Sequence, residues 1–105
     1  MIPYDNSPGI GWGPFKLAKD HPLFPAAEIH DANYDEIIQG TSKITLAEAD
    51  KLFEDNCLCI AMMQEDPGDR ERLRREAHMF YGVIRMWAFL IRPTLDAWKP
   101  GDPRP

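Results

Sequence analysis

The sequence predicts an all-α protein, and three observations support this fold class. Apolar residues recur every three or four positions in three separate segments, which is the period of an amphipathic helix. The segments are bounded by residues that commonly start or end helices, among them Pro25, Gly40, Thr45 and Pro93. No segment shows the strict alternation of apolar and polar residues that is typical of a β-strand.

An extended arm rich in proline and glycine is predicted for residues 1–24. Five prolines and three glycines fall within the first 25 positions, and both residue types interrupt helices and strands. Gly9, Gly11 and Gly13 alternate with larger residues, so the backbone there could curl around an ion and offer it carbonyl oxygens.

The first two predicted helices form an antiparallel hairpin. The first begins near Pro25 and ends at Gly40, because proline suits the first helical turn and glycine commonly follows the last. The second begins at Thr45, which forms a capping box with Glu48. A short loop between them makes the two helices antiparallel neighbours. Their apolar faces comprise Ala26, Ala27, His30, Tyr34, Ile37 and Ile38 in the first, and Leu46, Ala49, Asp50, Phe53, Cys57, Ile60 and Ala61 in the second.

A long third helix is predicted to follow, with Asp66 as its cap and Pro67 in its first turn. We expect it to run to Arg92, where Pro93 stops it. Its second half is apolar nearly all round, so it must be covered on more than one side. The sequence therefore predicts contact with a protein partner, or self-assembly, through residues 79–91 and the chain termini. The domain assignment is one helical domain over residues 1–92, including the arm, and a proline-rich tail over residues 93–105.

Composition narrows the function classes. A hydrophobic content of 44% and a charged content of 28% are typical of a soluble globular domain. The net charge of −5 argues against nucleic acid as a partner. No secretion signal is apparent, and Arg85 interrupts the longest apolar run, which is too short to span a bilayer. Cys57 and Cys59 lie two positions apart on a helix and point in different directions, so we expect no disulfide between them.

Two ionisable residues, His30 and Asp50, lie on the apolar faces of the consecutive helices, and we expect them to meet. A buried carboxylate needs a partner, and an imidazole that donates one N–H to it keeps its other nitrogen available to accept a proton. Tyr34, one turn after His30, would donate a second hydrogen bond to Asp50. Asp31 is predicted to lie at the edge of the apolar face, where its carboxylate could hold a cation. His21 and His78 show no acidic or metal-binding context in the sequence.

The run HDANY (30–34) matches the His-Asp-x-x-Tyr motif of phospholipase A2 enzymes, and EADKLF (48–53) resembles the helix that carries their second aspartate. With the run SPGIGWG, the chain also resembles the compact lipase domain of parvovirus capsid proteins. Over residues 22–90 it is most similar to small phage-encoded proteins that combine both helices with a later aromatic, arginine-containing helix. The chain departs from the secreted enzymes in lacking their disulfides and the tyrosine-led form of their glycine loop.

The resemblance implies an activity and roles for individual residues. In the phospholipase pattern the histidine is the general base for a water molecule, and the second aspartate orients it. This implies His30 as the base, Asp50 as the orienting acid and Tyr34 as a supporting donor. Asp31, with carbonyls of Gly9, Gly11 and Gly13, would bind Ca²⁺, which polarises the ester carbonyl of a phospholipid.

Two hypotheses from different function classes remain open. One is a Ca²⁺-dependent hydrolase of phospholipid acyl esters, made in a bacterial host cytoplasm and associated with a phage virion. The other is a non-enzymatic structural component of a phage particle, bound to other virion proteins, in which the pair of His30 and Asp50 only holds two helices in register.

Overall fold

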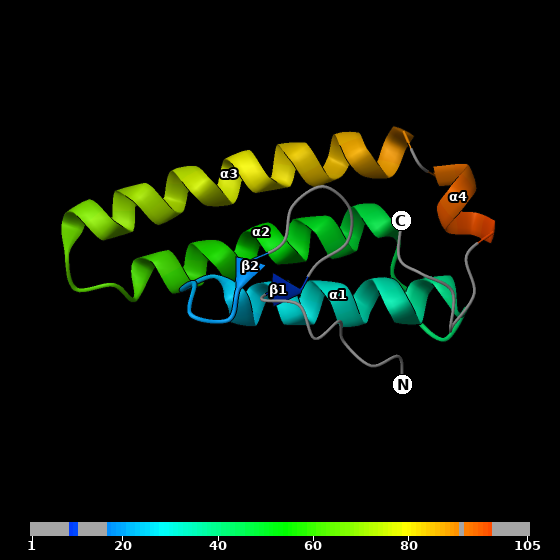
Figure 1. Cartoon of the computed structure of the whole chain (residues 1–105), viewed down its shortest axis with the longest axis horizontal. Helices are drawn as coiled ribbons and strands as arrows, with labels where there is room; N and C mark the ends of the chain where they lie inside the picture. Colours follow the sequence, from blue (N-terminus) through cyan, green and yellow to red (C-terminus); the bar gives the residue numbers. More distant parts are fainter. Residues whose placement is uncertain (1–8, 11–16, 91, 98–105) are drawn as a thin grey trace.

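The computed structural model describes residues 9–10, 17–90 and 92–97, and these confirm the all-α fold class (Figure 1). Three long helices run antiparallel to their neighbours in sequence, and α2 packs against both α1 and α3. Two very short strands, β1 and β2, lie beside α1. The elements are β1 (Gly9–Ile10), β2 (Leu17–Ala18), α1 (Phe24–Ile38), α2 (Leu46–Met62), α3 (Pro67–Leu90) and α4 (Arg92–Ala97).

The starts of α2 and α3 follow from the capping residues predicted for them. The Glu48 N–H donates to Thr45 Oγ1 at 3.1 Å, and the Thr45 N–H donates to Glu48 Oε1 at 3.2 Å. This reciprocal pair satisfies backbone donors that the first turn of a helix leaves unbonded. Asp66 Oδ2 accepts the Asp69 N–H at 2.9 Å and caps α3 in the same way.

Gly40 terminates α1 as predicted, through a conformation that favours glycine. Its φ is +78°, a left-handed value that costs glycine little. The Gly40 N–H donates to the Ile37 carbonyl and the Thr41 N–H donates to the Glu36 carbonyl. These are the two hydrogen bonds of a Schellman motif. The chain then reverses within a few residues to begin α2.

The structure differs from the predicted elements at both ends of the chain. Within the expected arm, Gly9–Ile10 pairs antiparallel with Leu17–Ala18, a pairing too short to show an alternating pattern in the sequence. The rest of the arm lies outside the described residues. At the other end α3 stops at Leu90, and Pro93 does not end it but lies in the first turn of α4. Proline is accepted there because the N–H of a first-turn residue has no intrahelical partner.

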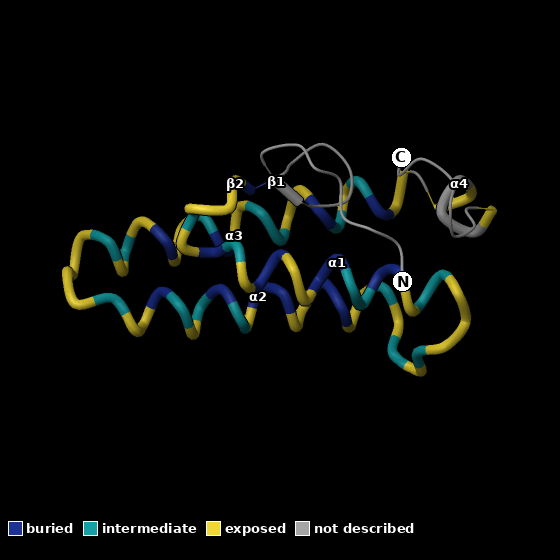
Figure 2. The backbone as a smooth tube through the Cα atoms, turned by 60° about the horizontal axis from the view of Figure 1, so that its bottom comes forward, coloured by how far each residue is buried: buried dark blue, intermediate teal, exposed yellow. Residues whose placement is uncertain are grey.

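The core follows the interfaces of α2 with its two neighbours. Buried positions recur along the three long helices, separated by exposed ones (Figure 2). The larger cluster joins both strand and helix residues, including Leu17, Phe53, Leu73 and Ile84. A smaller cluster around Tyr34 and Ala49 also receives Trp87 from α3. Among the described residues, no helix is long and apolar enough to span a membrane.

Candidate active site

The three residues predicted to form the site are in contact. His30 Nε2 lies 2.7 Å from Asp50 Oδ1, and the Tyr34 hydroxyl donates to the same oxygen at 2.7 Å. The α1–α2 loop therefore provides the offset that brings His30, in the middle of α1, level with Asp50, near the start of α2. The predicted contacts of this pair with each other and with Tyr34 are thus confirmed, whereas their catalytic roles stay predictions.

The arrangement of α1 fixes the orientation of the imidazole. His30 and Tyr34 lie one helical turn apart, so both side chains reach the α2 interface. The His30 ring is 4.5 Å from the Tyr34 ring and 5.0 Å from the Phe53 ring, measured between centroids. Only 4% of His30 is exposed. Packing against two aromatic rings restricts the imidazole to the orientation that meets Asp50.

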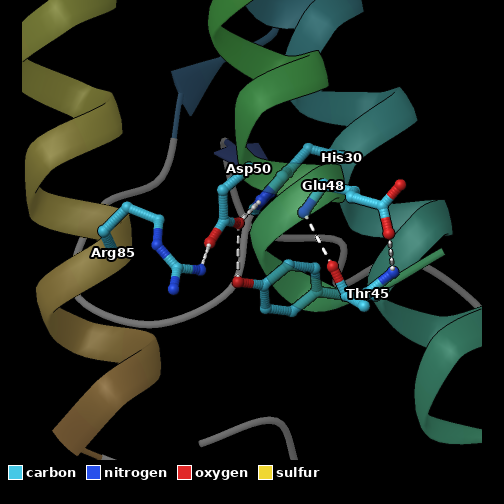
Figure 3. Close-up of polar contacts among 6 residues, drawn as sticks. His30, Thr45, Glu48, Asp50 and Arg85 are labelled. Carbon is cyan, nitrogen blue, oxygen red and sulfur yellow. Dashed lines mark hydrogen bonds and ion pairs between the residues drawn. The ribbon is translucent and has the colours of Figure 1, made fainter.

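Arg85 is a fourth member of the site that the sequence analysis missed. It extends from α3 and its NH1 group donates to Asp50 Oδ2 at 2.6 Å, so Asp50 lies between His30 and Arg85 (Figure 3). Arg85 is the residue that interrupts the apolar run of α3. A cation in such a run was the signal that could have identified it as the partner of a buried acid.

Burial and charge together determine the ionisation of this cluster. Asp50 has no exposed surface, and its two oxygens accept three hydrogen bonds. Burial, and then the charge of Asp50, raise the pKa of Tyr34 well above its ordinary value, so the phenol stays a donor. The hydrogen bond to Asp50 raises the pKa of Arg85. The cluster is therefore an imidazole, a neutral phenol and a guanidinium around one buried carboxylate.

The hydrogen bond to Asp50 also decides which imidazole nitrogen can react. A carboxylate accepts hydrogen from Nε2, which leaves the lone pair of the neutral ring on Nδ1. If Nδ1 takes a proton, the resulting imidazolium is stabilised by the charge of Asp50. Nδ1 is therefore the nitrogen that could accept a proton, in a ring of which only 4% is exposed.

Asp31 does not lie where the sequence analysis expected it. It is completely buried rather than at an exposed edge of α1, and Asp35, one turn later, is only 8% exposed. The helical pattern could not reveal that α1 contacts β1 and β2 as well as α2. Gly9 belongs to β1, so part of the glycine segment does contact α1, while Gly11 and Gly13 lie outside the described residues. Among the described residues, no three side chains of the metal-binding types cluster together.

Two other histidines have acidic partners that the sequence analysis did not foresee. His21 Nε2 lies 3.1 Å from Glu76, and His78 Nδ1 lies 3.0 Å from Glu54. Glu54 also accepts a hydrogen bond from Lys51 at 2.6 Å. Burial alone would raise the pKa of Glu54, but the hydrogen bonds from Lys51 and His78 outweigh it, and the pKa is lowered. These pairs join α3 to the strand end and to α2, and we assign them a structural role.

Comparison of the chain with protein-family models, curated proteins and solved structures found no significant match.

Proposed function

We propose that the protein is a phospholipase A2-like hydrolase of phospholipid acyl esters, with His30 as its general base. The observation that carries this proposal is the convergence of His30 and Tyr34 on the buried carboxylate of Asp50. The resemblance of the runs HDANY and EADKLF to the phospholipase motif adds the substrate class. The proposal includes the predicted arm, residues 1–24, whose glycine segment would provide carbonyl ligands for Ca²⁺.

The proposed reaction uses this chain's residues in three roles. Nδ1 of His30 removes a proton from a water molecule, which attacks the ester carbonyl, and later returns the proton to the leaving alcohol. Asp50 holds the ring orientation and stabilises the imidazolium formed in between. Tyr34 donates to Asp50 throughout, because its raised pKa keeps the hydroxyl protonated.

Calcium fits the acids of α1 in donor type. Asp31 and Asp35 are buried carboxylates one turn apart, and hard cations prefer oxygen ligands of this kind. Asp31, with Asp35 beside it, would therefore hold Ca²⁺. When bound, the ion would polarise the ester carbonyl.

A liposome assay with and without calcium tests this proposal. We expect His30→Gln to abolish hydrolysis while calcium binding in calorimetry stays intact, since the variant lacks only the base. Asp31→Asn should lower calcium affinity and hydrolysis together. Asp55→Asn is the control, because it removes one negative charge at an exposed position of α2. It should alter neither calcium affinity nor hydrolysis. A wild-type protein that neither hydrolyses phospholipid nor binds calcium would exclude the enzyme hypothesis.

A structural component of a phage particle is the second candidate, and the outer face of α3 favours it. Met79, Val83, Met86 and Leu90 are between 40% and 69% exposed and recur at helical spacing, with Phe89 beside them at 79%. An apolar stripe of this extent on a small domain is typical of a surface that contacts another chain. In this hypothesis virion proteins cover α3, and the pair of His30 and Asp50 joins two helices. Sedimentation tests whether a second copy of the chain can cover this face: the wild type should associate at high concentration and Met86→Glu should not, whereas a monomeric wild type contradicts self-assembly.

A further inference from the structure

A cavity of about 450 Å³ lies where the end of α1, the start of α2 and the α3–α4 junction come together. Its volume is in the range of small-molecule sites in proteins. Two arginines, Arg85 and Arg92, contribute to its wall. Apolar side chains form much of the remainder, namely Ile37, Leu46, Ala88 and Phe89. The cavity thus combines two fixed positive charges with an apolar lining.

Arg85 can serve the cavity and Asp50 at the same time. A guanidinium carries five N–H donors, and the hydrogen bond to Asp50 uses only the NH1 group. Figure 3 shows the other terminal nitrogen turned away from Asp50. The Arg85 side chain is 36% exposed, so these remaining donors can reach a ligand that enters from solvent.

Arg92 supplies the second charge. It is exposed at the start of α4, and no acidic side chain that the structure describes forms an ion pair with it. Asp50 balances Arg85, so the described side chains leave about one net positive charge at the cavity. A guanidinium pair of this kind suits the oxygens of a phosphate, which it can bind through paired N–H donors.

We propose that this cavity binds an anionic amphiphile, with a phosphate group between Arg85 and Arg92 and an alkyl chain along Leu46 and Phe89. The apolar wall would have little to contribute to a free phosphate ion, whereas it removes apolar surface of an alkyl chain from water. Phe89 is 79% exposed and continues the cavity onto the outer face of α3, so a longer chain could extend there.

The cavity is separate from the proposed catalytic nitrogen. Among its described lining residues are neither His30 nor Asp50, and the carboxylate of Asp50 stands between Arg85 and the imidazole. A ligand held by Arg85 therefore occupies the far side of Asp50. The inference does not rest on the proposed hydrolysis, and either can fail alone.

Calorimetry of the full chain in calcium-free buffer tests the inference with hexyl phosphate, inorganic phosphate and hexanol as separate probes. We expect hexyl phosphate to bind more tightly than either of the others, since only it has both the anion and the chain. Arg92→Gln should weaken its binding about tenfold, the scale of one charge-assisted hydrogen bond. Arg72→Gln, the same change at an exposed arginine near the other end of α3, should leave binding unchanged.

A second pair of variants tests the apolar wall. Phe89→Ala should weaken the binding of hexyl phosphate a few-fold and leave that of inorganic phosphate unaltered, while Met79→Ala, exposed on α3 away from the cavity, should change neither. All four positions are exposed, so circular dichroism should report unchanged folding. Absence of hexyl phosphate binding, or equal losses in Arg92→Gln and Arg72→Gln, would overturn the site. Equal affinity for hexyl phosphate and inorganic phosphate would contradict binding of an amphiphile and would indicate that the ligand is a free phosphate ion.

Discussion

Replacing Asp50 by asparagine tests whether the buried cluster holds the three long helices together. The substitution keeps the size and shape of the side chain and removes only its charge. One oxygen remains and can still accept hydrogen bonds from His30 and Tyr34. The other oxygen becomes an amide NH₂ group, which faces the NH1 group of Arg85, so two donors meet where an ion pair of 2.6 Å existed.

The expected loss can be estimated bond by bond. Hydrogen bonds to a charged acceptor contribute about 1.5–3 kcal/mol and neutral ones about 0.5–1.5 kcal/mol, so the bonds from His30 and Tyr34 should lose about 2 kcal/mol together. The bond from Arg85 is lost, but this side chain is partly exposed and can turn to solvent, which limits the cost to about 1 kcal/mol. A neutral amide is easier to bury than a carboxylate, and this offsets part of the loss. We therefore expect Asp50→Asn to lower the free energy of unfolding by about 2–3 kcal/mol.

Urea unfolding followed by circular dichroism measures this difference. A loss of this size should lower the midpoint by about 1–2 M urea, given the usual dependence of stability on denaturant. Asp55→Asn, on the same helix but 54% exposed, is the matched control and should stay within about 0.5 kcal/mol of the wild type. Equal urea midpoints for the two variants would refute the stabilising role of the buried cluster. A more stable Asp50→Asn protein would mean that burying the carboxylate costs more than its three hydrogen bonds contribute.

Three further predictions follow from the described contacts. The pKa of Tyr34 is raised in the folded chain, so the contribution of Tyr34 to stability is fully present below the ordinary tyrosine pKa of about 10 and is lost as the pH rises above it. In urea unfolding between roughly pH 9 and 11, the wild type should therefore lose more stability than Tyr34→Phe. Burial raises the pKa of the Cys57 thiol to about 12, whereas Cys59 is exposed. A thiol reagent near pH 8 should therefore modify only Cys59 in the folded wild type, and no cysteine should react rapidly in Cys59→Ala. The pKa of Glu54 is lowered in the folded chain, so its contribution to stability is present above the usual carboxyl pKa and is lost as the pH falls. Between roughly pH 6 and 3, the wild type should therefore lose more stability than Glu54→Gln.

The meeting of His30, Tyr34 and Asp50 could be predicted because it depends on local signals. Helical spacing places His30 and Tyr34 on one face of α1, and the capping box at Thr45 sets where α2 begins and hence which residues face α1. An ionisable residue on an apolar face must find a partner, and the hairpin left few candidates. The helical periodicity and a short loop were therefore enough to pair two residues 20 positions apart.

Arg85 and Asp31 could not be placed in the same way, because their surroundings depend on elements distant in sequence. Arg85 lies 35 positions after Asp50, and no helical pattern determines which turn of α3 lies opposite the start of α2. Asp31 seemed to lie at an edge of α1 because a hairpin alone would leave that side open. The contact of β1 with α1, formed by a two-residue strand, has no comparable signal in the sequence. The acidic partners of His21 and His78 were missed for the same reason as Arg85.

The arginine changes how the pair of His30 and Asp50 should be interpreted. Asp50 already has a cationic partner in Arg85 and a neutral donor in Tyr34, so an imidazole is not needed to balance its charge. A glutamine at position 30 could supply the remaining N–H donor without a titratable group. What histidine adds is a ring that packs against Tyr34 and Phe53 and a second nitrogen that can accept a proton. Arg85 therefore removes charge balance as the reason for a histidine at position 30, and His30→Gln is the variant that distinguishes a loss of chemistry from a loss of fold.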